Sequence, residues 1–93
     1  MEFEWDAGKE LTNIRKHKVA FVEAVDTFFD PKGFQMVDKK HSRGESRFYW
    51  VGKSSQGRVL TTWFTRRGLV IRIIGSAEWR QFRRLYDATT ETK

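Results

Sequence analysis

The sequence predicts a single α+β domain, because helical and strand-like apolar patterns occupy separate parts of a chain of only 93 residues. In the first third, Phe21, Val25 and Phe28 recur at i, i+4 and i+7, which indicates an amphipathic helix. From Phe34 onwards the apolar period becomes two, and short Gly-containing connections separate aromatic and β-branched runs. Consecutive runs of this kind are typical of an antiparallel β-meander. A final basic, amphipathic stretch predicts a C-terminal helix.

Local signals set the expected elements in chain order. Asp6 is a suitable N-cap for a first helix, in which Leu11 and Ile14 should lie on the inner face. Pro31 should stop the second helix, and Ser76 should cap the last one after the sheet has ended. The expected elements are a short N-terminal edge strand (Phe3–Trp5), helices to about Lys16 and over Ala20–Phe29, a short strand (Phe34–Asp38), three longer strands (Ser46–Lys53, Arg58–Thr65 and Leu69–Ile74) and a helix after Ser76.

The helices should each bury one apolar stripe. Phe29 should lie beside Phe28 on the inner face of the second helix. We place the single domain at residues 1–87 and expect a frayed tail at 88–93. The last helix should turn Arg80, Arg83 and Arg84 outward and bury Trp79, Phe82 and either Leu85 or Tyr86.

Composition and charge restrict the function classes. The absence of cysteine excludes disulfides, thiol nucleophiles and zinc ribbons, and no apolar stretch is long enough to span a membrane. Residues 1–30 hold 4 bases and 7 acids, whereas residues 31–93 hold 14 bases, mostly Arg, and 5 acids. A compact basic surface favours a polyanionic partner, with nucleic acid first, although solubility alone would also account for it. We expect a cytoplasmic protein.

Alternation along the longer strands sorts their side chains onto two faces. Phe48, Leu60 and Ile71 belong to the mainly apolar face that should pack under the helices. Arg72 lies between apolar pairs, where a charge needs a partner or an anionic ligand. Arginine binds phosphate and an exposed ring stacks on a base, so the opposite face suits RNA unless its rings cover the sheet or contact a partner protein. This face gathers Arg47, Tyr49, Thr61, Trp63 and Arg72.

The polar loop before the first long strand provides acid–base groups. Histidine is the side chain whose ordinary pKa lies nearest neutrality, and a carboxylate can accept a proton, so His41 or Glu45 is a candidate general base. The alternative is that Asp38 orders the turn, Glu45 pairs with a base and His41 is solvated. His17 and His41 lack the spacing of a metal site, and we expect no metal. Lys16 and His17 complement the negative end of a helix dipole without any further role.

Short motifs follow one another along the chain: Phe3-Glu4-Trp5-Asp6, Asn13-Ile14-Arg15-Lys16-His17, Glu23-Ala24, Asp38-Lys39-Lys40-His41-Ser42, Glu45-Ser46-Arg47, Gly57-Arg58, Ile71-Arg72-Ile73-Ile74-Gly75 and Trp79-Arg80. In this order and spacing they resemble the BrnT toxin family, and the similarity runs from Phe3 to Asp87. Many members have Ser-Ala-Arg after the Arg-Ile-Ile run, where this chain has Gly75-Ser76-Ala77. No role is therefore assigned to an arginine directly after that strand.

The resemblance implies a RelE-like fold and a bacterial type II toxin that arrests translation by cleaving RNA, without a metal or other cofactor. It implies a BrnA-like antitoxin as partner and leaves open whether the RNA is ribosome-associated mRNA. For such a nuclease, we expect Arg47 and Arg72 to hold the phosphate and His41 or Glu45 to act as the base. Lys16, Arg84 or Tyr86 would supply the acid or further charge, and Trp63, Tyr49, Arg80 and Arg84 would contact RNA.

Two other classes of function stay open at this point. A non-catalytic nucleic-acid-binding module would use the same face, and its binding would be salt-sensitive without yielding cleavage products. An inactive toxin relic would act only through its antitoxin. Its basic surface would then meet an acidic or amphipathic segment of that partner.

Overall fold

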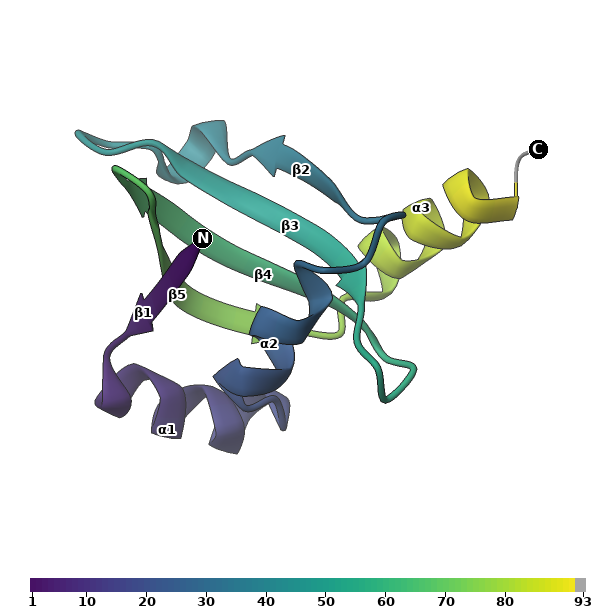
Figure 1. Ribbon diagram of the computed structural model, residues 1–93, viewed down its shortest axis with the longest axis horizontal. Helices are drawn as coiled ribbons and strands as arrows, with labels where there is room; N and C mark the ends of the chain where they lie inside the picture. The colour runs from purple at the N-terminus through teal and green to yellow at the C-terminus, as the bar shows by residue number, and fades with distance from the viewer. Residues whose placement is uncertain (92–93) are drawn as a thin grey trace.

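Three helices and one five-stranded sheet make up the fold, as a computed structural model that describes residues 1–91 shows (Figure 1). The expected α+β class is confirmed. No helix in the described part of the chain is long and apolar enough to cross a membrane. The elements are β1 (Glu2–Trp5), α1 (Ala7–His17), α2 (Phe21–Thr27), β2 (Phe34–Val37), a 3-10 turn η1 (Lys39–His41), β3 (Arg47–Lys53), β4 (Val59–Arg67), β5 (Val70–Ala77) and α3 (Arg80–Glu91).

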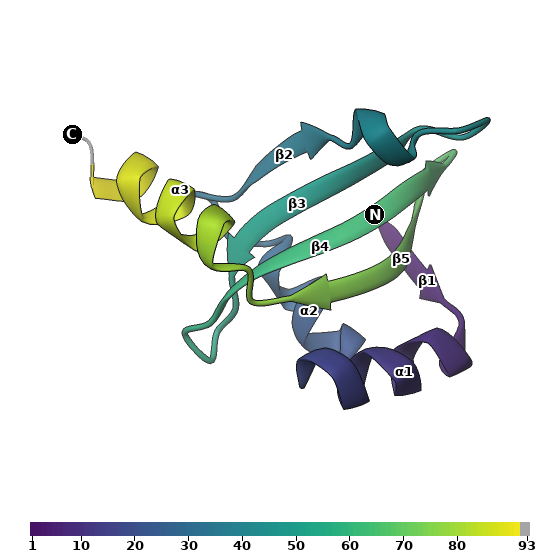
Figure 2. The ribbon, with the colours of Figure 1, turned by 180° about the vertical axis from the view of Figure 1, so that it is seen from behind.

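The sheet has the strand order β1-β5-β4-β3-β2. Strands β2 to β5 form the expected antiparallel meander, whereas β1 pairs in parallel with β5. Helix α2 crosses one face of the sheet (Figure 1). Seen from behind, β3, β4 and β5 present their other face between α1 at one side and α3 at one end (Figure 2). We call this second face the open face.

The main core lies between α2 and the sheet. Phe21 and Ala24 from α2 pack with Phe64, Ile71 and Ile73 from β4 and β5, and all five side chains are buried. Aromatic rings from several elements surround this cluster, and such pairs contribute about 0.5–1.5 kcal/mol each beyond their burial. This face is therefore fully used for folding, and the chemistry must be sought elsewhere.

Helix α1 is oriented differently from the sequence-based expectation. Asp6 caps it as predicted, accepting a hydrogen bond from the Lys9 N–H at 2.9 Å. The predicted inner residues Leu11 and Ile14 are instead 59% and 38% exposed, and the buried residue is Asn13. The prediction was wrong because hydrogen bonds made by Asn13, and not apolar contact, fix the inner face of α1. The amide of Asn13 donates to the carbonyls of Val19 (2.9 Å) and Ser76 (2.8 Å) and accepts from the Ser76 N–H (3.0 Å).

Helix α2 ends earlier than predicted. Its last residue is Thr27, and Phe29, expected inside, is 70% exposed. The Thr27 carbonyl accepts a hydrogen bond from the Trp50 indole N–H at 2.8 Å, and the Thr27 hydroxyl donates to the Ala24 carbonyl at 2.7 Å. These hydrogen bonds are made at the last residue of α2, so the helix ends at Thr27, ahead of Pro31.

Strand β5 runs on to Ala77, beyond the predicted end of the sheet. A β-bulge between Trp63 and Phe64 lets the strand continue, so Ser76 is buried within the sheet and does not cap α3. Gly75 is required there, because a Cβ atom would lie 2.1 Å from the Trp63 ring. Bulges insert an extra residue and increase local twist, which alternation alone does not reveal.

Helix α3 shows which of Leu85 and Tyr86, the alternatives left by the sequence, is buried. Tyr86 is buried, whereas Leu85 is 42% exposed. Helix α3 continues to Glu91 and so includes the first residues, from Ala88, of the stretch that was expected to be frayed. The last two residues of the predicted tail, 92–93, lie outside the described residues. As predicted, Arg80, Arg83 and Arg84 all face solvent.

Candidate active site on the open face of the sheet

A line of polar residues crosses the open face, one from each strand or its end. In the register of the sheet, Arg47 lies opposite Thr65, and Thr65 lies opposite Arg72. Arg72 in turn lies opposite Glu4, and the Asp38 N–H donates to the Arg47 carbonyl at 2.8 Å. Directly opposed side chains share a face, so these five residues form one cross-strand row. Arg47 and Arg72 therefore share the open face, as alternation predicts, about 10 Å apart across β4.

The centre of the row holds two unpaired polar atoms. Among the described residues, Arg47 Nε and Thr65 Oγ1 are the buried side-chain polar atoms that lack a hydrogen-bond partner. A buried donor or acceptor left without a partner costs about 1–3 kcal/mol, and native proteins contain few of them. Each such group calls for an explanation, and a catalytic role is one of them. Thr65 did not stand out in the sequence, because only the strand register places it between the two arginines.

Arg72 already has a partner within the protein. Its Nη1 donates to Glu4 Oε2 at 3.0 Å, and the two side chains are 31% and 42% exposed. Part of the charge that suggested an anionic ligand is thus accounted for by Glu4. Exposed ion pairs of this kind contribute only about 0–1 kcal/mol, so a phosphate can replace Glu4 at little cost.

His41 stands next to the row through its contact with Asp38. The ring Nδ1 lies 2.9 Å from Asp38 Oδ2, and the His41 side chain is 51% exposed while that of Asp38 is 6% exposed. Burial acts to raise the pKa of Asp38, but hydrogen bonds from His41 and Tyr49 outweigh it, so this pKa lies below its ordinary value. With Nδ1 directed to a carboxylate, Nε2 is left to accept a proton.

The loop that carries His41 is held by local hydrogen bonds. Asp38 caps the short turn η1 by accepting from the His41 N–H at 3.3 Å. The Ser42 hydroxyl donates to the Asp38 carbonyl at 2.6 Å and accepts from the Arg47 N–H at 2.9 Å. Asp38 was expected only to order the turn. Its spacing of three residues from His41 was the available signal for the pair.

The two aromatic residues predicted to stack on bases are covered instead. The Trp63 ring stacks on Trp79, with centroids 4.9 Å apart and an interplanar angle of 12°. The Tyr49 ring contacts Trp79 at 5.9 Å and Phe82 at 5.6 Å. The start of α3 thus lies over this part of the face, which fits the alternative that these rings cover the sheet. Burial, followed by the nearby Asp38 carboxylate, raises the pKa of Tyr49.

Other predicted site residues lie apart from the row. Glu45 pairs with Arg67 at 3.2 Å, where both are exposed. Tyr86 is buried beside Val51 and Val59, and its hydroxyl donates to Asp30 at 2.6 Å. Burial and this hydrogen bond raise the pKa of Tyr86 to about 12. The structure brings neither residue to the cross-strand row.

The remaining predicted residues lie on helices beside the open face. Lys16 lines a cavity between α1 and the sheet. Arg80 and Arg84 are exposed on α3 around a surface hollow that includes Trp79. Within residues 1–91 no three His, Asp or Glu side chains are grouped so as to hold a metal ion.

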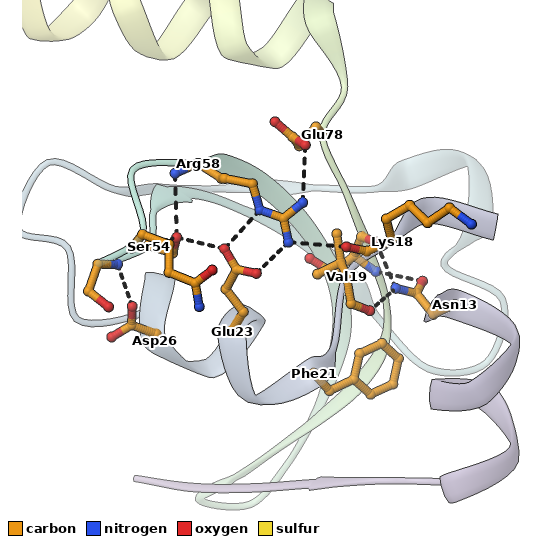
Figure 3. A network of polar contacts seen from close by, with 12 residues as sticks. Asn13, Lys18, Val19, Phe21, Glu23, Asp26, Ser54, Arg58 and Glu78 are labelled. Atoms are coloured by element: carbon orange, nitrogen blue, oxygen red, sulfur yellow. Dashed lines mark hydrogen bonds and ion pairs between the residues drawn. The ribbon is translucent and has the colours of Figure 1, made fainter. Parts of the chain in front are cut away.

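A second arginine centre lies just before β4, at the opposite end of that strand from Thr65, and its three guanidinium nitrogens are all paired (Figure 3). Arg58 donates from Nε to Glu23 Oε2 at 3.0 Å, from Nη2 to Glu23 Oε1 and the Lys18 carbonyl, and from Nη1 to Glu78 at 3.2 Å. The Ser54 hydroxyl also donates to Glu23, at 2.8 Å. The Arg58 hydrogen bond lowers the pKa of Glu23 despite burial. This network joins α2 to the β3–β4 connection and explains the Glu23-Ala24 and Gly57-Arg58 motifs as structural.

A small α+β domain with two arginines and a paired histidine on one open sheet face is suited to binding and processing RNA. The family model described as the ribonuclease toxin BrnT of type II toxin–antitoxin systems matches residues 5–81. The chain therefore belongs to the BrnT family. It is an enzyme of the ribonuclease toxin class, and a type II system pairs such a toxin with an antitoxin.

A solved structure shows the same fold. The crystal structure of the Brucella abortus ribonuclease toxin, BrnT, matches with a TM-score of 0.63 and 20% sequence identity, covering 87% of this chain and 99% of that chain. No curated protein matches the sequence.

Proposed function

We propose that the cross-strand row is the catalytic site of a metal-independent endoribonuclease that stops translation by cleaving RNA in the cytoplasm. The observation that carries this proposal is the unpaired Arg47 Nε beside the unpaired Thr65 hydroxyl, midway along the row. Preorganised donors that point to a developing charge are typical of transition-state stabilisation. Arg47 and Arg72 then hold the scissile phosphate from two sides.

The reaction is an attack of the ribose 2′-OH on the neighbouring phosphorus. His41 Nε2 takes the proton from the 2′-OH, and Asp38 holds the ring through Nδ1. The new O–P bond closes a 2′,3′-cyclic phosphate, and the bond to the 5′-oxygen breaks. The leaving oxygen takes a proton from water at the open face, and the resulting hydroxide removes the proton from His41, which restores the base. Arg47 and Arg72 stabilise the extra negative charge that develops on the phosphate oxygens.

Purified protein and a single-stranded RNA test these roles. Arg47→Ala and Arg72→Ala should each slow cleavage by about 30- to 1000-fold, the 2–4 kcal/mol of a missing electrostatic stabiliser. Arg66→Ala is the matched control, because Arg66 follows Thr65 on the same strand, is exposed and faces the other way. An oligonucleotide lacking the 2′-OH should resist cleavage, and EDTA should leave the rate unchanged. Unchanged cleavage by folded Arg47→Ala and Arg72→Ala proteins would remove the site.

Expression in cells tests the biological part of the proposal. Induction of the wild-type chain should stop growth and degrade RNA, and co-expression of a BrnA-like antitoxin should prevent both. Arg47→Ala should still form the antitoxin complex, and its induction should no longer stop growth. Degradation confined to ribosome-bound mRNA would identify that form of RNA as the substrate. Harmless expression of a wild-type chain that still binds its antitoxin would favour an inactive relic.

A further inference from the structure

A cavity of about 340 Å³ lies between α1 and the bulged part of the sheet. Its volume is within the range of small-molecule sites, about 300–1,000 Å³. Three side chains from the strands and the cap of α1 contribute: Asp6, Trp63 and Ile74. The rest of the lining comes from one stripe of α1: Gly8, Lys9, Thr12, Asn13, Lys16 and His17.

The stripe of α1 that faces the cavity is polar where an amphipathic helix is normally apolar. Lys9, Thr12 and Lys16 follow at i, i+3 and i+7, so they lie on one face of the helix. Leu11 and Ile14 point to solvent instead. Asn13 has a structural role through its hydrogen bonds, but within residues 1–91 neither lysine forms an ion pair. Two lysines without an ion pair in the lining of a cavity are suited to an anionic ligand.

The wall of the cavity is rigid and partly apolar. Trp63 is held between Trp79 on one side and Gly75 on the other, and the His17 ring meets it edge-on at 5.9 Å. The ring is therefore fixed, and its edge and Ile74 line the cavity. Asp6 is the acidic group of the lining. Its carboxylate already accepts the Lys9 N–H, so it serves the helix cap and leaves two lysine charges against one carboxylate.

The cavity continues the open face beyond the cross-strand row. Ile74 follows Arg72 by two residues on β5, and Asp6 follows Glu4 by two residues at the end of β1. Residues two apart on a strand share a face and lie about 7 Å apart. A chain held at Arg72 therefore reaches the cavity within one nucleotide.

We propose that this cavity is a subsite for the nucleotide next to the cleaved linkage, a proposal that rests on the RNA cleavage proposed above. Lys9 and Lys16 bind the phosphate that follows the scissile one. Trp63 and Ile74 form the wall against which its sugar and base lie. The subsite thus fixes the position of the strand relative to Arg72 and Arg47.

The test measures binding of a mixed-sequence 2′-O-methyl RNA octamer, which lacks a free 2′-OH and stays intact. Affinity is measured against salt for wild type, Lys9→Gln/Lys16→Gln and the matched control Arg15→Gln/Lys18→Gln. The control removes two charges at the C-terminal end of α1, outside the lining of the cavity, where both side chains are exposed. For a single strand, removal of one lysine–phosphate interaction should reduce the slope of log K against log salt by about 0.7. We expect that reduction for the Lys9/Lys16 variant and little change for the control.

Parallel cleavage of unmodified RNA separates this proposal from the one on which it rests. Suppose that wild type cleaves RNA and that the salt slope of the Lys9/Lys16 variant equals those of wild type and of the control. The subsite is then overturned and the catalytic row stands. If wild type binds through Lys9 and Lys16 without cleaving, the nuclease proposal fails, and the cavity is an RNA-binding site without a cleaved linkage beside it. Weaker antitoxin binding by the Lys9/Lys16 variant without a change in RNA slope overturns the subsite and makes the cavity an antitoxin contact. Absence of both binding and cleavage in wild type refutes both.

Discussion

Arg58 and Arg47 are both partly buried arginines, but the protein treats them in opposite ways. All three nitrogens of the Arg58 guanidinium donate within the chain, to Glu23, Glu78 and the Lys18 carbonyl (Figure 3). Arg47 has a buried Nε with no partner. A saturated arginine fixes the fold, whereas an arginine with an unsatisfied donor next to an open face is a candidate for a functional role. This contrast distinguishes the structural arginine from the candidate functional one, which burial alone does not, since both are partly buried.

The largest effect is expected from breaking the paired centre. Arg58→Met leaves the Glu23 carboxylate, only 7% exposed, without its main partner. Removing one member of a buried ion pair costs about 3–5 kcal/mol, and the 28% exposure of Arg58 places the expected loss near the lower end, about 3 kcal/mol. Urea unfolding measures it. Cleavage per folded molecule should stay at the wild-type level, and a loss below about 0.5 kcal/mol would contradict a structural role.

Arg47→Lys should have the opposite effects to Arg58→Met: cleavage should fall while stability is kept. Lysine keeps the charge but lacks the planar fork of donors, so cleavage should fall about 10- to 100-fold. The free energy of unfolding should stay the same or rise, since an unpaired buried Nε is removed. Steady-state cleavage and urea unfolding of the same preparation give both values. A stability loss as large as that of Arg58→Met would show that Arg47 is structural too.

Tyr86 extends the comparison to a second paired group. Its pKa is raised to about 12 in the folded protein, against about 10 when unfolded, by burial and by the hydrogen bond to Asp30. The folded state therefore favours the protonated hydroxyl, and this stabilisation is full below pH 10 and is lost as pH rises towards 12. The loss should reach about 2 kcal/mol. Tyr86→Phe should lack this component of the alkaline loss in urea unfolding, and equal pH profiles would contradict the assignment.

The smallest effect concerns Arg72, which has one exposed ion pair and so lies between the fully paired Arg58 and Arg47 with its unpaired Nε. Glu4→Gln removes the exposed carboxylate that pairs with it. Affinity for the 2′-O-methyl octamer should rise about two- to fivefold, because an exposed ion pair contributes at most about 1 kcal/mol. Glu45→Gln, which frees the exposed Arg67 instead, is the control. A weaker affinity for Glu4→Gln would mean that Glu4 orients Arg72 for the RNA.

Local patterns were enough to predict the meander, the Asp6 cap and the shared face of Arg47 and Arg72. These features depend on neighbouring residues, and period-two alternation fixes a face without knowledge of the partner strand. The inner face of α1 was mispredicted because Asn13 bonds to Ser76, 63 residues away. The residues around Asn13 contain no pattern that predicts such a long-range hydrogen bond.

The candidate site was predicted only in part for the same reason. The pairing of β1 with β5, which brings Glu4 to Arg72, joins the two ends of the fold. The place of Thr65 depends on the register of three strands, and the cover over Tyr49 and Trp63 depends on where α3 begins. Patterns within one segment specify none of these relations.

Because β1 pairs only with β5, the first strand of the chain has no sheet partner until residues 70–77 have been synthesised. A growing polypeptide that ends before β5 has neither Arg72 nor the strand that positions Glu4 beside it. The strand pair that places Glu4 beside Arg72 therefore forms only near the end of the chain's own translation.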